Sequence, residues 1–127
     1  GVIVMDTNAV SDIVLAKLST LHHRVYRNQS INAPIAPYIV YMIQSLTPTD
    51  PSVDFYLNVD IYDEPHTSVR DIETLADLIQ DELDNLVLQT EDFSLHLTLE
   101  QRQFITQSDL TDAQMINLRF VGRTYFI

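Results

Sequence analysis

The residues that could do chemistry are few, and their spacing forms no catalytic set. Glycine occurs only twice, so no glycine-rich loop can bring backbone amides around a phosphate. His22 and His23 are adjacent, His66 and His96 stand apart, and no serine lies in the glycine-flanked turn of a hydrolase nucleophile. The lack of cysteine removes thiolate catalysis, disulfides and sulfur-based zinc sites. We therefore expect no catalytic residue, no cofactor and no metal.

One short motif offers an alternative. Residues 2–14, "VIVMDTNAVSDIV", carry an aspartate between an apolar run and a helix-like segment. The motif resembles the opening of PIN-domain nucleases, in which clustered carboxylates hold a divalent metal, and Asp6 would be the matching ligand. That family requires parallel strands alternating with helices, whereas the later pattern of this chain indicates hairpins. The same residues also fit a helix that Thr7 or Asn8 caps.

A second group of carboxylates follows one face of an expected helix. Glu73, Asp77, Asp81 and Asp84 are spaced four and three residues apart, so they form an acidic stripe, and each neighbouring pair costs a few tenths of a kcal/mol. No basic residue interrupts the stripe. The stripe is typical of a solvated helix face. Its functional interpretation is a surface that meets a basic partner or lines a channel for DNA.

Two strands carry the remaining candidates. In "VDFYLNVDIYDE" the residues Val53 to Ile61 alternate between apolar and polar, which predicts a strand with one buried face. Half-exposed tyrosines among short polar groups are frequent at protein interfaces, although simple solvent exposure explains them equally well. The last strand presents arginines in the same alternating way. The candidate interface residues are Tyr56, Asn58, Asp60, Tyr62, Arg119 and Arg123.

The elements that position these residues follow from hydrophobic periodicity. Helical spacing predicts helices over 8–21 and from Ser68, which fits an N-cap, to about Leu86. Strands are expected over 24–29, 38–46, 53–61, 93–105 and 115–127, with a stiff proline bridge before the second. A hairpin connection is expected between the last two. The predicted fold is α+β, a two-layer, mainly antiparallel sheet with two helices on one face, in the order α-β-β-β-α-β-β and forming one domain.

Composition narrows the class of protein. The 127 residues suffice for one compact domain, and the apolar runs are too short to cross a membrane. Eighteen acidic and seven basic side chains give a net charge of −11, so tight binding to nucleic acid through its phosphates is not expected. The start of the chain lacks the features of a secretory signal, which favours a cytoplasmic location.

The succession of segments resembles the tail terminator, or tail completion, proteins of long-tailed bacteriophages. It is carried by a short helix, "RVY", a proline bridge, "PYIVY", a turn, "FYLNVDIYD" and the helix "IETLADLIQDELDNL", over about Asp6 to Leu88, with a late strand "LRFVGRTYFI". The resemblance implies a non-enzymatic virion protein of the tail or neck, present in the host cytoplasm during assembly. It implies a hexameric ring that caps the tail tube and joins the head.

The implied partners are other copies of the chain, the tail tube protein and a head-completion or connector protein. DNA would pass through the ring without being bound, and no membrane is involved. The acidic stripe would line the lumen, and the tyrosine-bearing strand faces would form the subunit or tail contact. An acidic adaptor or inhibitor that binds a basic protein would share this charge and this lack of chemistry, so it stays an alternative beside the nuclease.

Overall fold

The protein folds as two helices and six strands within the residues that the structure, a computed structural model, describes: 6–49, 52–64, 68–106 and 114–126. The order is α1 (Thr7–Leu21), β1 (Val25–Arg27), β2 (Tyr38–Thr49), β3 (Ser52–Asp63), α2 (Val69–Leu83), β4 (Val87–Gln89), β5 (Phe93–Thr106) and β6 (Gln114–Phe126). The predicted α+β class and element order are confirmed, and β4 is an addition. Neither described helix is long and apolar enough to span a membrane.

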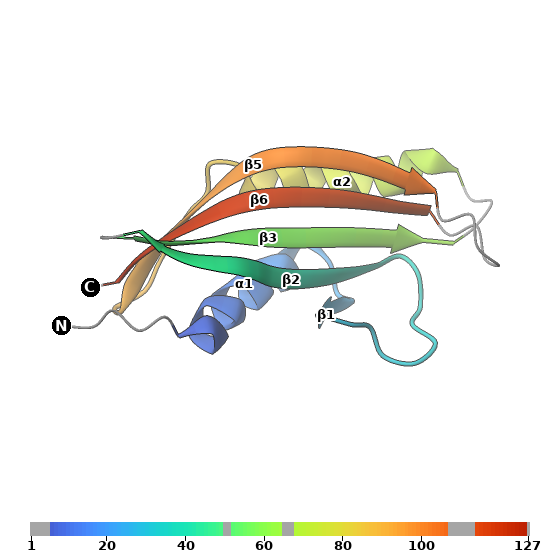
Figure 1. The fold of residues 1–127 in the computed structure, drawn as a ribbon. Coiled ribbons are helices and arrows are strands. Elements are labelled where there is room, and N and C mark those ends of the chain that lie inside the picture. The colour runs from blue at the N-terminus through green and yellow to red at the C-terminus, as the bar shows by residue number, and fades with distance from the viewer. Residues whose placement is uncertain (1–5, 50–51, 65–67, 107–113, 127) are drawn as a thin grey trace.

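All six strands belong to one curled sheet in the order β1-β2-β3-β6-β5-β4 (Figure 1). After β3 the chain runs through α2 to the far edge of the sheet, and β5 and β6 then return it to the side of β3. The pairs β2–β3, β3–β6, β6–β5 and β5–β4 are antiparallel, as predicted. The expected hairpin connection at residues 107–113 lies outside the described residues, but β5 and β6 on either side of it pair in antiparallel fashion.

The first pair of strands is the parallel pair in this mainly antiparallel sheet. β1 runs parallel to β2, with Val25 opposite Ile39, so a short turn does not join them. Residues 28–37 instead carry the chain back to the end of the sheet where β1 began, as any parallel pair requires. The proline bridge therefore acts as a crossover and not as a hairpin loop.

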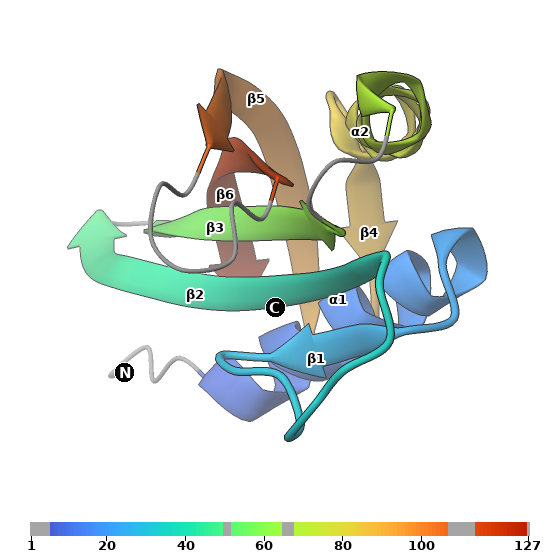
Figure 2. The same cartoon turned by 90° about the vertical axis from the view of Figure 1, so that its right-hand side faces the viewer.

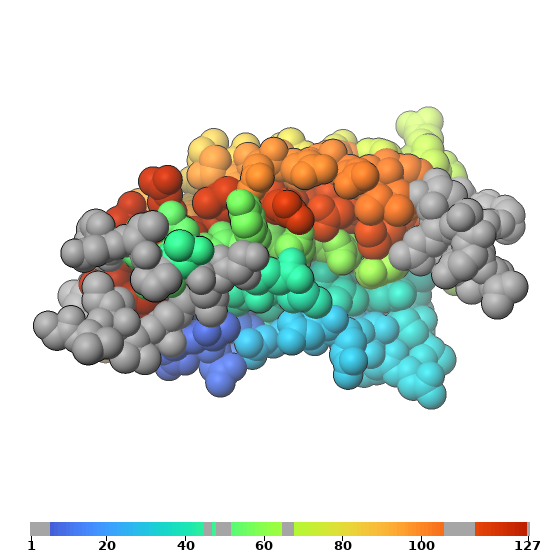
Figure 3. All heavy atoms as spheres, in the orientation of Figure 1, coloured from blue at the N-terminus to red at the C-terminus, as the bar shows by residue number. Residues whose placement is uncertain are grey.

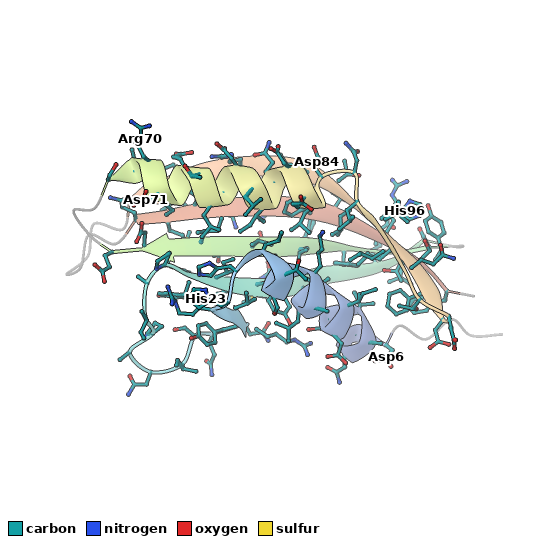
Figure 4. The ribbon with its side chains drawn as sticks, turned by 180° about the vertical axis from the view of Figure 1, so that it is seen from behind. Asp6, His23, Arg70, Asp71, Asp84 and His96 are labelled. Carbon is teal, nitrogen blue, oxygen red and sulfur yellow. The ribbon has the colours of Figure 1, made fainter. Side chains whose placement is uncertain are left out.

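Both helices lie on the same face of the sheet, as Figures 2 and 4 show from two directions. The alternation predicted for β3 is confirmed, because every second residue from Val53 to Ile61 is buried. Facing side chains of α1, α2 and the four long strands complete one core. Its members with no exposed surface include Val10, Leu18, Leu57, Val59, Ile61, Ile72, Ala76, Ile79, Leu83, Leu95, Ile116, Leu118 and Phe120.

Capping side chains fix the residues at which the two helices begin. Asp6 caps α1, because its carboxylate accepts a hydrogen bond from the backbone N–H of Ala9 at 3.0 Å. The prediction that Thr7 or Asn8 is the cap is wrong by one or two residues. Ser68 caps α2 as predicted, with its hydroxyl accepting from the N–H of Arg70 at 3.2 Å. Asn85, at φ 63°, ends α2 in the left-handed conformation that asparagine tolerates.

Candidate functional site

The sheet face away from the helices, here called the outer face, brings the candidate interface residues together. Tyr56, Asn58, Asp60 and Tyr62 alternate along β3, and Arg119 and Arg123 do so along the neighbouring β6. The register sets Asn58 opposite Arg119. Figure 3 looks onto this face, which β2, β3, β6 and β5 build together.

The polar side chains at the centre of the outer face hold one another in place. The amide of Asn58 donates to Gln44 Oε1 at 2.6 Å, and its oxygen accepts from Arg119 Nε at 3.3 Å. Asn117 Nδ2 donates to Asp60 Oδ1 at 2.6 Å. These groups border an open depression of about 280 Å³, lined by Met42, Gln44, Asn58, Asp60, Gln103, Ile105, Met115, Asn117 and Arg119. The polar groups are therefore ordered before any partner arrives.

Aromatic side chains flank this network. Tyr38 and Tyr62 stack with ring centroids 5.0 Å apart, and Tyr26 and Tyr38 form an edge-to-face pair with centroids 6.2 Å apart. The guanidinium of Arg119 lies 5.1 Å from the ring centroid of Tyr56, within the range of a cation–π contact. The side chain of Arg123 is 60% exposed, and its Nε lies 3.7 Å from the carboxylate of Asp54, which is a loose ion pair. Arg119 is thus held on two sides, whereas Arg123 is not.

Burial changes the acidity of the groups around Tyr62. Desolvation raises the pKa of Asp60, and the hydrogen bond from Asn117 opposes that shift. Burial also raises the pKa of Tyr62, to which the nearby Asp60 and Tyr38 add. Burial raises the pKa of Tyr38 as well. The ionised form of Asp60 therefore destabilises the folded protein.

Replacing Asp60 with asparagine is expected to raise the melting temperature at neutral pH. The pKa of Asp60 is higher in the folded chain than in the unfolded chain, so its ionised form destabilises the folded protein. This loss of stability is absent below the ordinary carboxyl pKa of about 4. It is complete at pH values above the raised pKa. The asparagine oxygen can still accept from Asn117. Thermal melts at neutral and acidic pH test this. The gain should vanish on acidification, and a less stable Asp60→Asn protein at neutral pH would contradict the assignment.

The acidic stripe is not a free row of charges. Arg102 of β5 donates to Asp77 at 2.7 Å and to Gln80 at 2.9 Å, and it also forms an ion pair with Glu73. Asp84 accepts from the backbone N–H of Leu99 at 2.8 Å. Within the described part of the chain, Asp81 is the one member of the stripe that forms no hydrogen bond or ion pair. The stripe itself contains no basic residue, as the sequence indicates, but β5 supplies one from across the chain.

Sequence reasoning missed Arg102 because of a β-bulge. The pairing of β5 with β6 shifts between Leu99 and Gln101. Inward positions are odd-numbered before the shift and even-numbered after it, so Arg102 opposes the buried Leu118 and faces α2. The only signal in the sequence is the loss of apolar alternation after Leu99.

The remaining candidate residues, Asp6 and the histidines, form no common site in the described residues. Asp6 serves as the cap of α1, and the described residues contain no group of three or more histidines or carboxylates that could hold a metal. His22 Nε2 donates a hydrogen bond to the carbonyl of Pro37 at 2.8 Å, and burial lowers the pKa of His22. His96 lies near the start of β5 (Figure 4), against the ring of Tyr125. His66 lies outside the described residues.

No protein-family model and no curated protein matches the chain. Nineteen chains of solved structures do match it. One of them superposes with a TM-score of 0.67 over 92% of this chain and 96% of its own length, at 14% sequence identity. At that identity the likeness shows the fold alone. The fold is therefore one that other proteins share, and a function for this chain has to be argued from its surfaces.

Proposed function

We propose that the protein is a structural component of a long-tailed bacteriophage, which caps the tail tube as a ring and offers the surface that joins the head. The sequence of segments that resembles tail terminator proteins motivates the proposal. The observation that carries it is the outer face. Four long strands spread tyrosines, arginines and amides over one side of the sheet, and those side chains hold each other in place.

The chemistry of the outer face suits contact with another protein. Tyrosine and arginine contribute most often to binding energy when they lie near the centre of an interface. Tyr56 and Arg119 lie on the two central strands, and Asn58 already restrains Arg119. Binding there loses less side-chain entropy than binding to a mobile surface would. We assign this face to the tail tube or to a neighbouring subunit.

The charge of the chain suits a passage for DNA. A net charge of −11 repels phosphates, so DNA could move past the ring without sticking. Because Arg102 pairs with both Glu73 and Asp77 and offsets one of their two charges, the repulsion rests on the overall charge of the chain more than on an unbroken stripe.

Electron microscopy of tails assembled with and without this protein tests the proposal. Without the protein we expect tubes of uncontrolled length or tails without heads. Tails of normal length that carry heads in its absence would overturn the proposal. A protein that binds a basic partner as a monomer would favour the adaptor. Cleavage of nucleic acid that requires manganese and is lost in Asp6→Asn would favour the nuclease.

A further inference from the structure

Asp60 of β3 is an acidic side chain to which the described part of the chain supplies no cation. It lines the open depression on the outer face, the face that Figure 3 views. Its Oδ1 accepts the hydrogen bond from Asn117 Nδ2 at 2.6 Å. Within the described residues, Oδ2 forms no hydrogen bond and the carboxylate forms no ion pair. A carboxylate that is partly buried, as this one is, normally has a cation or several hydrogen-bond donors around it.

The arginine on the neighbouring strand is turned away from Asp60. Arg119 lies opposite Asn58, which precedes Asp60 by two residues on β3. Its Nε donates to Asn58 Oδ1 at 3.3 Å, and its guanidinium lies 5.1 Å from the ring centroid of Tyr56. Tyr56 precedes Asp60 by four residues, which corresponds to about 13 Å along a strand. Asn58 and Tyr56 therefore hold the guanidinium of Arg119 away from the carboxylate of Asp60.

The acidity of Asp60 agrees with this arrangement. Burial raises the pKa of Asp60, the hydrogen bond from Asn117 opposes that shift, and no cation of the described residues adds to the opposition. An asparagine at position 60 would keep the hydrogen bond without the charge. Residues that lower the stability of a free chain in this way are typical of surfaces that act on a partner.

Apolar side chains line another part of the same depression. Met42, Ile105 and Met115 belong to its wall, and Ile105 lies opposite Met115 in the register of β5 with β6. A second acceptor is present beside Asp60, because Asn117 Oδ1 forms no hydrogen bond among the described residues. The depression thus combines an apolar wall with a charged acceptor and a neutral one. An aliphatic chain that ends in a cation fits this combination.

We propose that the depression takes up a basic side chain, a lysine or an arginine, of the protein that binds the outer face. The aliphatic stem lies against Met42, Ile105 and Met115, and the cation meets Oδ2 of Asp60. The net charge of −11 attracts a basic partner and repels a second copy of this chain, so the occupant belongs to a different protein. The inference rests on the proposed function in one respect, which is that this protein is the tail tube.

A titration with n-butylammonium chloride, which has the stem and cation of lysine, tests the site without any partner. 1-Butanol is the uncharged control, and nuclear magnetic resonance follows the side-chain amide of Asn117 at constant ionic strength. We expect a saturable shift with n-butylammonium, about fivefold weaker binding in Asp60→Asn, and no change in Asp54→Asn. Asp54 is the matched control because it lies on the same strand and face but already has Arg123 Nε 3.7 Å away. Equal binding of the two compounds, or undiminished binding by Asp60→Asn, would overturn the proposal.

The capping of tails tests the same contact in the assembly. Asp60→Asn is expected to need about tenfold more protein for equal capping and to lose part of the salt dependence of the wild type, although it melts at no lower temperature. Equal capping by Asp60→Asn and the wild type at every salt concentration would overturn this inference and leave the proposed function standing. Uptake of n-butylammonium that requires Asp60, in a protein without which tails assemble normally, would support this inference and overturn the proposed function.

Discussion

Replacing Gly122 with alanine is expected to destabilise the protein by about 2–3 kcal/mol, because the new methyl group has no room. Gly122 of β6 lies opposite Phe55 of β3 in the register. A Cβ built at Gly122 would approach Cε2 and Cε1 of the Phe55 ring to 2.7 and 2.8 Å, well inside van der Waals contact. The phenylalanine ring covers the bare backbone of the glycine, so the two residues form one packed unit.

The ring cannot give way cheaply. Phe55 is 2% exposed and belongs to the core that also contains Leu57 and Phe120, so moving it disturbs packed neighbours. Urea unfolding of the wild type and Gly122→Ala measures the loss. The double variant Gly122→Ala/Phe55→Leu is the control, since a smaller side chain at position 55 should make the alanine less costly in that background. Alanine also restricts the unfolded chain, so a clash-free site would show equal or higher stability. That result would contradict the packing described here.

Local periodicity was enough to predict most of the fold. The alternation of Val53 to Ile61 and the helical stripe of Ile72, Ala76, Ile79 and Leu83 report burial directly, because a strand and a helix each repeat over a few residues. The same alternation predicted that Asn58, Asp60 and their neighbours share a face. These inferences need no knowledge of which strands are neighbours.

Features that depend on distant pairing could not be read in this way. The parallel contact of β1 with β2, the three residues of β4 and the bulge that turns Arg102 toward α2 all depend on partners elsewhere in the chain. The network at the outer face has the same origin. Alternation places Asn58 and Arg119 on polar faces, but only the register of β3 with β6 sets them within hydrogen-bonding distance.

Replacing Arg119 with alanine is expected to weaken tail capping by about 2 kcal/mol or more, or about thirtyfold in the concentration required. Arg119 lies on a central strand, and Asn58 and Tyr56 position its guanidinium. Its loss removes a preordered donor from the middle of the proposed contact. The loss of one partly exposed hydrogen bond and one cation–π contact should change the free energy of unfolding by only about 1 kcal/mol. Electron microscopy gives the fraction of capped tails at increasing protein concentration, and thermal melts give stability.

The matched control is Arg102→Ala, on the opposite face of the neighbouring strand. Arg102 opposes Leu118, the residue next to Arg119, yet it points to α2 and pairs with Glu73 and Asp77. Its removal leaves two carboxylates without their cation, so it should cost at least as much stability as Arg119→Ala while leaving capping intact. Two variants that lose stability alike but differ in capping would place the contact on the outer face. Normal capping by Arg119→Ala, or an equal loss in both variants, would place it elsewhere, because the two arginines differ chiefly in the side of the sheet that they occupy.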